Sequence, residues 1–574
     1  MAAIDKTFDY LVPDSFRDQV RVGTIVRIPL HGRRVRGWVV EVDVEPPPGV
    51  RLLPIAKVTG WGPTPEVIEI ARWTAWRWAG RVATVLETAS PPGAVTGLPS
   101  AFVQRRIAAE SALKGSQELT ARVIRTGGGV LRLPPASDVV PVVATAAAAL
   151  GDLAVVCPSV DTARRIGSIL RRNGLSMALY DRDWARAAAG GSTVIGARST
   201  VFASNRGGFG GFVVIDEHDE AHHEERMPTW HARDVAIERA RRSNVPLLLV
   251  SPTPSLEALE WAGPDRTFTP NRQVERDGWP ILQIVDRTQE DPFRASILSA
   301  QLLRYLRTDG RIVCILNRKG RARLLACKSC MDVARCEKCD AAVVQPSGES
   351  RLHCQRCGTD RPVICTRCGS TAMRNGRPGI TRLREELEAL VGEPVTELEG
   401  HGVASDPPTR VVIGTEAALH QVREAAVVAF LDLDQELLAP RYRAAEQALA
   451  LLARAGRLVG GRSNGGVVLV QTWHPDHEVL AAAMNGDPDR VVERERARRR
   501  ELGFPPFAAI AEVSGAGAAE FVGTLGHPPG VDVLGPDQER WLLRAGDPQV
   551  LADALVRTPR PAARLRVEVD PLRL

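Results

Sequence analysis

Short apolar runs alternate with longer amphipathic segments along most of the chain. Eight of these runs are rich in Val, Ile, Leu and Ala, and each ends in a polar loop, which is typical of buried parallel strands in an α/β fold. One set precedes a cysteine cluster at 327–368 and another follows it, so the pattern predicts two similar lobes. The segments are 152–160, 192–202, 211–222, 245–259, 311–325, 409–419, 426–437 and 465–477.

The two ends of the chain follow other patterns. The N-terminal region predicts short strands separated by turn residues ("FDYLVP", "GTIVRIPL", "RGWVVEV"), and hence a small β domain. In "RWTAWRWAG", Trp73 and Trp76 lie three residues apart, which favours a packed helix face over a nucleic-acid stacking surface. "VVERERARRRELGFPPF" predicts a charged helix before a final small domain, and a solvated face is favoured for it over a contact with a DNA backbone.

Composition adds little to this picture. The 574 residues are 44% hydrophobic and 25% charged with a net charge of +6, as in an ordinary globular protein of two to four domains. Only six of the 74 basic residues are lysines, which a GC-rich genome explains, although arginine also binds phosphate well. No membrane-spanning run or signal peptide is evident, so we expect a cytoplasmic protein, and no motif indicates an obligate oligomer, so we expect a monomer.

Eight of the ten cysteines form four Cys-x-x-Cys pairs in the middle of the chain. A reducing compartment disfavours disulfides, and four thiolates complete one tetrahedral zinc site, so eight predict two closed, structural Zn²⁺ sites. The pairs could combine sequentially, crosswise or in a nested order. Fourteen residues separate Cys339 from Cys354, and a hairpin through this gap favours nesting. The nested sites are Cys327, Cys330, Cys365 and Cys368, and Cys336, Cys339, Cys354 and Cys357.

Several motifs in a fixed order resemble the PriA family of primosomal replication-restart proteins (primosomal protein N′). They are "KTFDYLVP", "GFVVIDEHDEAH", "HARDVAIERA", "SPTPSLEAL", the cysteine cluster, "VVIGTEAAL", "LARAGR" and "HPDH". The resemblance covers nearly the whole chain, and it implies a multidomain α/β protein with two RecA-like helicase lobes, a zinc insert in the second lobe and a nested pairing of the cysteines.

The resemblance also implies a domain order. We expect a 3′-DNA-end-binding domain at 1–97, a linker at 98–130 too short for the winged helix of the family, and a first lobe at 131–270. A second lobe at 271–475 would carry the insert at 325–370, and a small α+β domain would occupy 476–574. Implied partners are DNA forks and 3′ ends, other primosome proteins, single-strand-binding protein and the machinery that loads the replicative helicase.

The helicase pattern breaks at the nucleotide site. A phosphate-binding loop needs Gly-x-x-x-x-Gly-Lys-Ser/Thr, yet the chain has no Gly-Lys dipeptide, and "GGGVLRLPPASDVVP" stands where the loop is expected. Pro252 interrupts a second motif, and the acidic motif Asp-Glu-Glu-His is one glutamate short. These changes predict that both lobes are degenerate and argue against ATP as a cofactor, while residual ATP binding stays open. The remaining members of a vestigial nucleotide site are Asp216, Glu217, Arg454 and Arg457.

The resemblance further implies a pocket for a DNA 3′ end. Carried over by position, its residues are Phe8, Asp9, Tyr10, Gly32 and Lys57. Asp9 can accept a hydrogen bond from a base or a 3′-hydroxyl, the aromatic rings offer stacking faces, and Lys57 offers a phosphate contact. Without the resemblance, Phe8 and Tyr10 would be interpreted as strand core and Asp9 as a turn residue.

The sequence therefore predicts a replication-restart protein that binds abandoned or stalled forks and helps to reload the replisome without unwinding DNA. One alternative is an active ATP-dependent 3′-to-5′ helicase with a divergent nucleotide site, although the missing Gly-Lys argues against it. Another is a zinc-dependent scaffold for other proteins.

Overall fold

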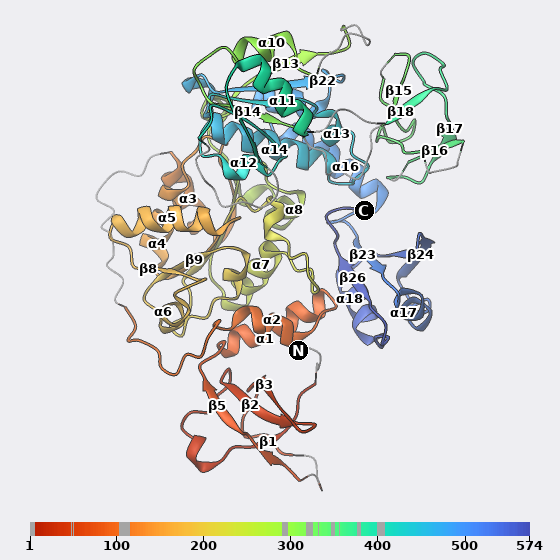
Figure 1. The fold of residues 1–574 in the computed structure, drawn as a ribbon. Helices are drawn as coiled ribbons and strands as arrows, with labels where there is room; N and C mark the ends of the chain where they lie inside the picture. The colour runs from red at the N-terminus through yellow and green to blue at the C-terminus, as the bar shows by residue number, and fades with distance from the viewer. Residues whose placement is uncertain are drawn as a thin grey trace. The chain divides into compact units, whose positions relative to one another are not determined.

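The computed structural model describes residues 6–46, 49, 51–102, 115–289, 297–316, 325–330, 332–345, 350–354, 356–375, 380–398 and 408–574. Its contacts divide the chain into two compact units (Figure 1). Unit 1 contains 1–131, 139–268 and 503–571, and unit 2 contains 132–138, 269–502 and 572–574. In the described part of the chain, no helix is long and apolar enough to cross a membrane.

Unit 1 begins with the predicted small β domain. Its antiparallel sheet has the order β3-β2-β5, and a short parallel pair, β1 and β4, lies beside it. Two helices, α1 and α2, follow, and in α1 Trp73 packs edge-to-face on Trp78 at 5.5 Å, as expected for a packed face. The elements are β1 (Tyr10–Leu11), β2 (Ile25–Leu30), β3 (Arg33–Trp38), β4 (Leu53–Pro54), β5 (Lys57–Gly60), α1 (Pro65–Arg77) and α2 (Val82–Ala89).

The first lobe is a parallel seven-stranded sheet with the order β12-β6-β11-β10-β7-β9-β8. Its strands are buried on both faces, and α4, α5 and α7 pack on it, which confirms the α/β prediction. The strands are β6 (Gly128–Arg132), β7 (Leu153–Val156), β8 (Met177–Leu179), β9 (Thr193–Gly196), β10 (Gly211–Ile215), β11 (Leu247–Ser251) and β12 (Thr267–Phe268). The helices are α3 (Ser116–Arg125), α4 (Val140–Leu150), α5 (Val160–Arg172), α6 (Trp184–Ala189), α7 (Ala232–Ser243) and α8 (Leu256–Ala262).

The end of the chain returns to unit 1 as an antiparallel sheet with the order β24-β25-β23-β26. Its helix α18 packs on α1, where Trp76 Nε1 donates to Asp553 at 2.9 Å. The elements are β23 (Ala509–Ser514), α17 (Ala518–Leu525), β24 (Val531–Asp537), β25 (Arg540–Ala545), α18 (Pro548–Arg557) and β26 (Arg566–Val569).

Unit 2 holds the second lobe, a parallel sheet with the order β13-β22-β21-β14-β20-β19. The strands are β13 (Ile281–Asp286), β14 (Ile312–Ile315), β19 (Val395–Leu398), β20 (Val411–Gly414), β21 (Val427–Phe430) and β22 (Val467–Thr472). The helices are α9 (Arg272–Asp277), α10 (Ala300–Tyr305), α11 (Ile380–Val391), α12 (Ala418–Gln421), α13 (Asp434–Leu437), α14 (Ala444–Val459), α15 (Glu478–Asn485) and α16 (Asp489–Leu502). The predicted C-terminal range 476–574 thus spans α15 and α16 of unit 2 as well as the final sheet of unit 1.

The charged helix α16 does not have the fully solvated face that its sequence suggests. The side chains of Glu495 and Arg499 are 0% and 1% exposed, and Arg499 pairs with Glu446 at 2.5 Å and with Glu495 at 3.3 Å. The solvated-face prediction is therefore wrong for these two positions, because α14 covers them and supplies a carboxylate that the local pattern cannot reveal.

Candidate functional site

The cysteine insert in unit 2 contains two small antiparallel pairs of strands. The outer pair is β15 (Leu325–Cys327) with β18 (Met373–Asn375), and the inner pair, which lies between them in the sequence, is β16 (Arg351–His353) with β17 (Asp360–Pro362). The cysteines come together in the nested order, with the ligand atoms of each set within 4.8 Å of one another: Cys327, Cys330, Cys365 and Cys368, and Cys336, Cys339, Cys354 and Cys357.

The donor sets fit a tetrahedral zinc ion. The Sγ atoms of Cys336 and Cys357 lie 3.4 Å apart and those of Cys327 and Cys368 lie 3.5 Å apart, while Zn–S bonds of about 2.3 Å require sulfurs about 3.8 Å apart. The backbone amide of Lys338 donates to Cys336 Sγ at 3.4 Å, and such amide contacts stabilise thiolates. Four thiolates around each position leave no place for water or substrate, so these sites can brace the insert but offer no catalytic position.

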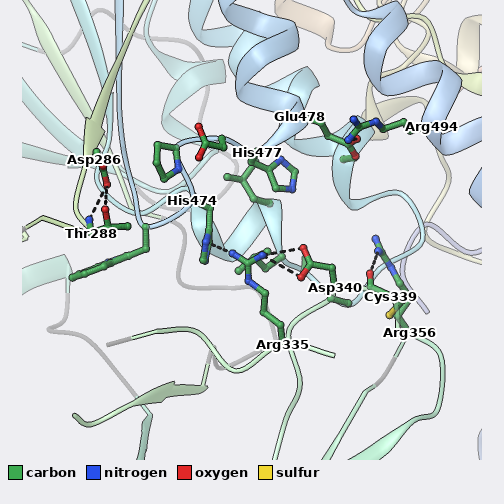
Figure 2. A pocket seen from close by; sticks show the side chains of 18 of the residues that line it. Asp286, Thr288, Arg335, Cys339, Asp340, Arg356, His474, His477, Glu478 and Arg494 are labelled. Atoms are coloured by element: carbon green, nitrogen blue, oxygen red, sulfur yellow. Dashed lines mark hydrogen bonds and ion pairs between the residues drawn. The ribbon is translucent and has the colours of Figure 1, made fainter. Parts of the chain in front are cut away.

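Unit 2 also contains a cavity of about 650 Å³, lined by residues of the insert and of the second lobe (Figure 2). Arg335 of the insert pairs with Asp340 at 2.9 Å and donates to His474 Nδ1. Burial, together with Arg335, lowers the pKa of His474 to about 3, which keeps the ring neutral and able to accept this bond. Among its described lining residues, the cavity carries no excess of positive charge, because four arginines are balanced by four carboxylates. They are Arg335, Arg356, Arg494 and Arg498, and Asp286, Asp340, Asp476 and Glu478.

The segment that replaces the phosphate-binding loop lies between β6 and α4. Pro134 and Pro135 have no N–H, the amide of Ala136 donates to Gly278 O at 3.1 Å, and that of Ser137 donates to Pro134 O at 2.9 Å. Arg132, which precedes the segment, forms ion pairs with Glu275 at 2.8 Å and with Asp489 at 2.6 Å. A phosphate cradle depends on several free amides in one concave turn, and these four positions offer none.

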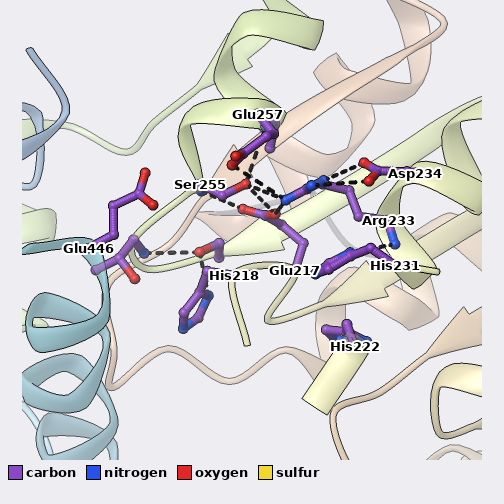
Figure 3. Close-up of polar contacts among 12 residues, drawn as sticks. Glu217, His218, His222, His231, Arg233, Asp234, Ser255, Glu257 and Glu446 are labelled. Atoms are coloured by element: carbon purple, nitrogen blue, oxygen red, sulfur yellow. Dashed lines mark hydrogen bonds and ion pairs between the residues drawn. The ribbon is translucent and has the colours of Figure 1, made fainter. Parts of the chain in front are cut away.

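The acidic motif after β10 is turned into the protein (Figure 3). Glu217 is 0% exposed, and it accepts hydrogen bonds from the amide and the hydroxyl of Ser255 at 2.7 and 2.8 Å. Arg233, from the "HARD" motif, lies 3.6 Å from Glu217 and 2.8 Å from Asp234. Burial raises the pKa of Glu217, and the contacts with Arg233 and Ser255 oppose that rise. Glu217 thus acts as a buried structural acceptor in this structure.

The other residues of the vestigial nucleotide site are buried or hydrogen-bonded within the protein. Asp216 is 3% exposed and has a positive φ of 52° at the end of β10. In unit 2, Arg454 donates to His420 Nδ1 at 2.6 Å, and Arg457 Nε donates to the carbonyl of Pro135 at 3.4 Å. Arg457 therefore contacts the very segment that replaced the phosphate loop.

The predicted 3′-end residues lie before and in β1, in the turn after β2 and at the start of β5 of the small β domain. Phe8 is 42% exposed and precedes β1, so it does not contribute to a strand core. Tyr10 is half-buried, and its hydroxyl donates to Pro29 O at 2.9 Å, which places the ring beside the end of β2. Gly32 has a φ of 73° in the turn after β2, while Asp9 and Lys57 are exposed.

Comparison with known proteins decides the family. Residues 1–91 match the model of the PriA 3′DNA-binding domain. The "Probable replication restart protein PriA" of Mycobacterium leprae is 30% identical, and the match covers 97% of this chain and 94% of the relative. The chain belongs to the PriA family of replication restart proteins.

Other matches are less complete. The "Probable replication restart protein PriA" of Mycobacterium tuberculosis is 28% identical over 92% of this chain and 90% of the relative. The "Replication restart protein PriA" of Bacillus subtilis is 28% identical over 56% of this chain, and the match spans 43% of that protein. A solved structure of S. cerevisiae Dbp5 is 12% identical over 66% of this chain and 93% of its own, with a TM-score of 0.37, a likeness too weak to carry an argument.

Proposed function

We propose that this protein binds abandoned or stalled replication forks, holds the 3′ end of the nascent strand in its N-terminal domain and supports reloading of the replisome without acting as an ATP-driven helicase. The loss of the motor rests on one observation above all. The backbone amides that would cradle the phosphates are missing at Pro134 and Pro135 and already bonded at Ala136 and Ser137.

The second nucleotide motif supports the same proposal. Binding of a Mg²⁺–triphosphate would require the Glu217 carboxylate to leave Ser255 and Arg233. The buried ion pair between Arg233 and Glu217 would then be broken. Breaking such a buried pair costs about 3–5 kcal/mol. Because no phosphate loop is present to offset this cost, the degenerate lobes serve in the proposal as a scaffold for the DNA-binding parts.

The two four-cysteine sites hold structural zinc in this proposal. Their chemistry gives the insert a rigid fold without a large core, which suits a surface that contacts other proteins. The partners that we propose are single-strand-binding protein, other primosome proteins and the loading machinery of the replicative helicase.

The proposed 3′-end pocket consists of Phe8, Asp9, Tyr10, Gly32 and Lys57. Exposure of Phe8 leaves its side chain accessible to a terminal base, and Asp9 supplies an acceptor for the 3′-hydroxyl. Pairing of β1 with β4 and the bond from Tyr10 to Pro29 hold Tyr10 beside the end of β2, which leads into the turn that contains Gly32.

A fork-binding titration tests the pocket. Binding of a fork with a leading-strand 3′-hydroxyl should be tighter than binding of a 3′-phosphate fork by about 1–3 kcal/mol, because the phosphate brings charge beside Asp9 and removes its hydrogen bond. Asp9→Ala should abolish the preference, whereas Asp18→Ala, an exposed acid of the same domain, should keep it. Equal affinity of the wild-type protein for the two forks at matched salt would refute the pocket.

A further inference from the structure

Three cations lie in one row across the N-terminal sheet. In the register of β2 with its neighbours, Arg27 is directly opposite Arg36 of β3 on one side and Lys57 of β5 on the other. Residues directly opposite one another share a face of the sheet, so all three side chains leave the same face. Arg34 lies on this face too, opposite Pro29 and two residues from Arg36. Figure 1 shows the three strands of this sheet side by side.

Arg36 stacks over the ring of Trp38 at 5.2 Å, but charge pairing within the fold does not account for this row. Like charges directly opposite in a sheet are destabilising. Arg27 and Lys57 are exposed, and no ion pair joins Arg27, Arg36 or Lys57 to any carboxylate in the part of the chain that the structure describes. Burial lowers the pKa of Arg36 and Arg27 adds to this effect, while Glu87 of α2 opposes it from a distance beyond an ion pair. The row therefore carries an excess of positive charge that a bound anion would relieve.

The row begins at the proposed 3′-end pocket. Lys57 belongs to both, and β2 runs from Arg27 to Pro29, where the Tyr10 hydroxyl is bonded, and then to the turn with Gly32. Strands in a sheet lie about 4.8 Å apart, so the row is about 10 Å long. Phosphates of one duplex strand advance about 3.4 Å each along the helix axis, so three consecutive phosphates span about 7 Å of that axis. Long lysine and arginine side chains that leave a row about 10 Å long can reach three such phosphates.

We propose that Lys57, Arg27 and Arg36 bind consecutive phosphates of the DNA strand whose 3′ end lies in the pocket. This inference rests on the proposed function of the pocket, and it adds the path of the strand away from it. The row reads no base, so it contributes affinity and strand direction without sequence preference. Arg34 extends the same face toward the hairpin turn.

The salt dependence of fork binding tests the row. Each phosphate contact contributes about 0.9 to the slope of log affinity against log salt, so Arg27→Gln and Arg36→Gln should each lower the slope by about that amount. Between 50 and 200 mM salt, each variant should then lose about 3-fold less affinity than the wild-type protein loses. Arg33→Gln is the matched control, because Arg33 is exposed, opposite Leu30, and on the other face of β3.

Forks with chemically modified phosphates test whether the row contacts the DNA next to the 3′ end. Neutral methylphosphonate linkages at the three 3′-terminal phosphates should weaken the wild-type complex and should weaken the Arg27→Gln/Arg36→Gln complex much less. Equal weakening of the two proteins, or unchanged salt slopes in both single variants, would overturn the proposal. The proposal would also be overturned if Arg33→Gln changed the salt slope as much as Arg27→Gln does. The effect would then come from the net charge of the domain and not from contacts of the row with phosphates.

Failure of the row and failure of the pocket are distinguishable. The row variants should keep the preference for a 3′-hydroxyl over a 3′-phosphate, whereas Asp9→Ala should lose that preference and keep the wild-type salt slope. Since removal of one like charge relieves repulsion, the melting midpoints of Arg27→Gln and Arg36→Gln should equal or exceed that of the wild type. A variant that melts well below the wild type would show instead that the row supports the sheet.

Discussion

Replacement of Glu217 by alanine separates a structural acid from a catalytic one. The Glu217 carboxylate is 0% exposed, accepts bonds from Ser255 at 2.7 and 2.8 Å and lies 3.6 Å from Arg233, whose side chain is 5% exposed. Glu217→Ala leaves the Ser255 amide unsatisfied and removes a carboxylate from a buried guanidinium. The loss from breaking a buried pair is about 3–5 kcal/mol. Because Asp234 and Glu257 still face Arg233 in the variant, we expect the lower end of this range, about 3 kcal/mol.

Thermal unfolding measures this loss. Because the protein has several domains, the midpoint of the transition that changes is compared, without a two-state fit. At about 2–4 °C per kcal/mol, a loss of about 3 kcal/mol should lower the midpoint by roughly 6–12 °C. Glu225→Ala, an exposed glutamate of the same region, should stay within about 0.5 kcal/mol of the wild type. If Glu217→Ala melted with the wild type, the carboxylate would not be structural, and a role in binding nucleotide would regain support.

Three further outcomes follow. Elemental analysis should find about two zinc ions per chain, and Cys336→Ser should lose one and destabilise the insert; fewer than about one and a half in the wild type would count against two sites. Burial and Arg335 lower the pKa of His477 to about 4 in the folded protein. As the pH drops, this histidine therefore takes up a proton in the unfolded chain before it does so in the folded one, and the free energy of unfolding should fall between about pH 6.5 and 4. His477→Asn, which can still accept from the Val479 amide as an N-cap, should flatten that decline. Tyr10→Phe should weaken fork binding only slightly, because the ring stays and only the bond to Pro29 is lost.

Much of the fold follows from local pattern. The eight apolar runs all contain a buried parallel strand, because β-branched residues in short runs leave few other ways to bury both faces of a segment. The nested cysteine sets followed from the length of the gap between Cys339 and Cys354, which sets how the chain can turn back.

Contacts between distant segments could not be predicted in this way. The buried pair of Arg499 with Glu446 joins two helices, and the bond from Ser255 to Glu217 spans 38 residues. Local charge patterning predicts solvent for such groups, and only the packed structure shows which carboxylate covers which cation.

The row of Lys57, Arg27 and Arg36 could have been predicted from the sequence, but it was not. His31 and Gly32 form a two-residue loop with positive φ at both positions, as a type I′ hairpin requires. Such a loop fixes the register, and counting back from it places Arg27 opposite Arg36. The turn chemistry in "PLHGRR" was therefore the available signal.

Fork-stimulated ATP hydrolysis tests the central claim most directly. The amides of Ala136 and Ser137 are bonded within the protein, and Pro134 and Pro135 have none, so we expect no turnover above the protein-free background at a fork concentration that saturates binding. Turnover that rises with fork DNA and disappears in Asp216→Asn would contradict the account, because it would show that the second nucleotide motif still works in a functioning motor.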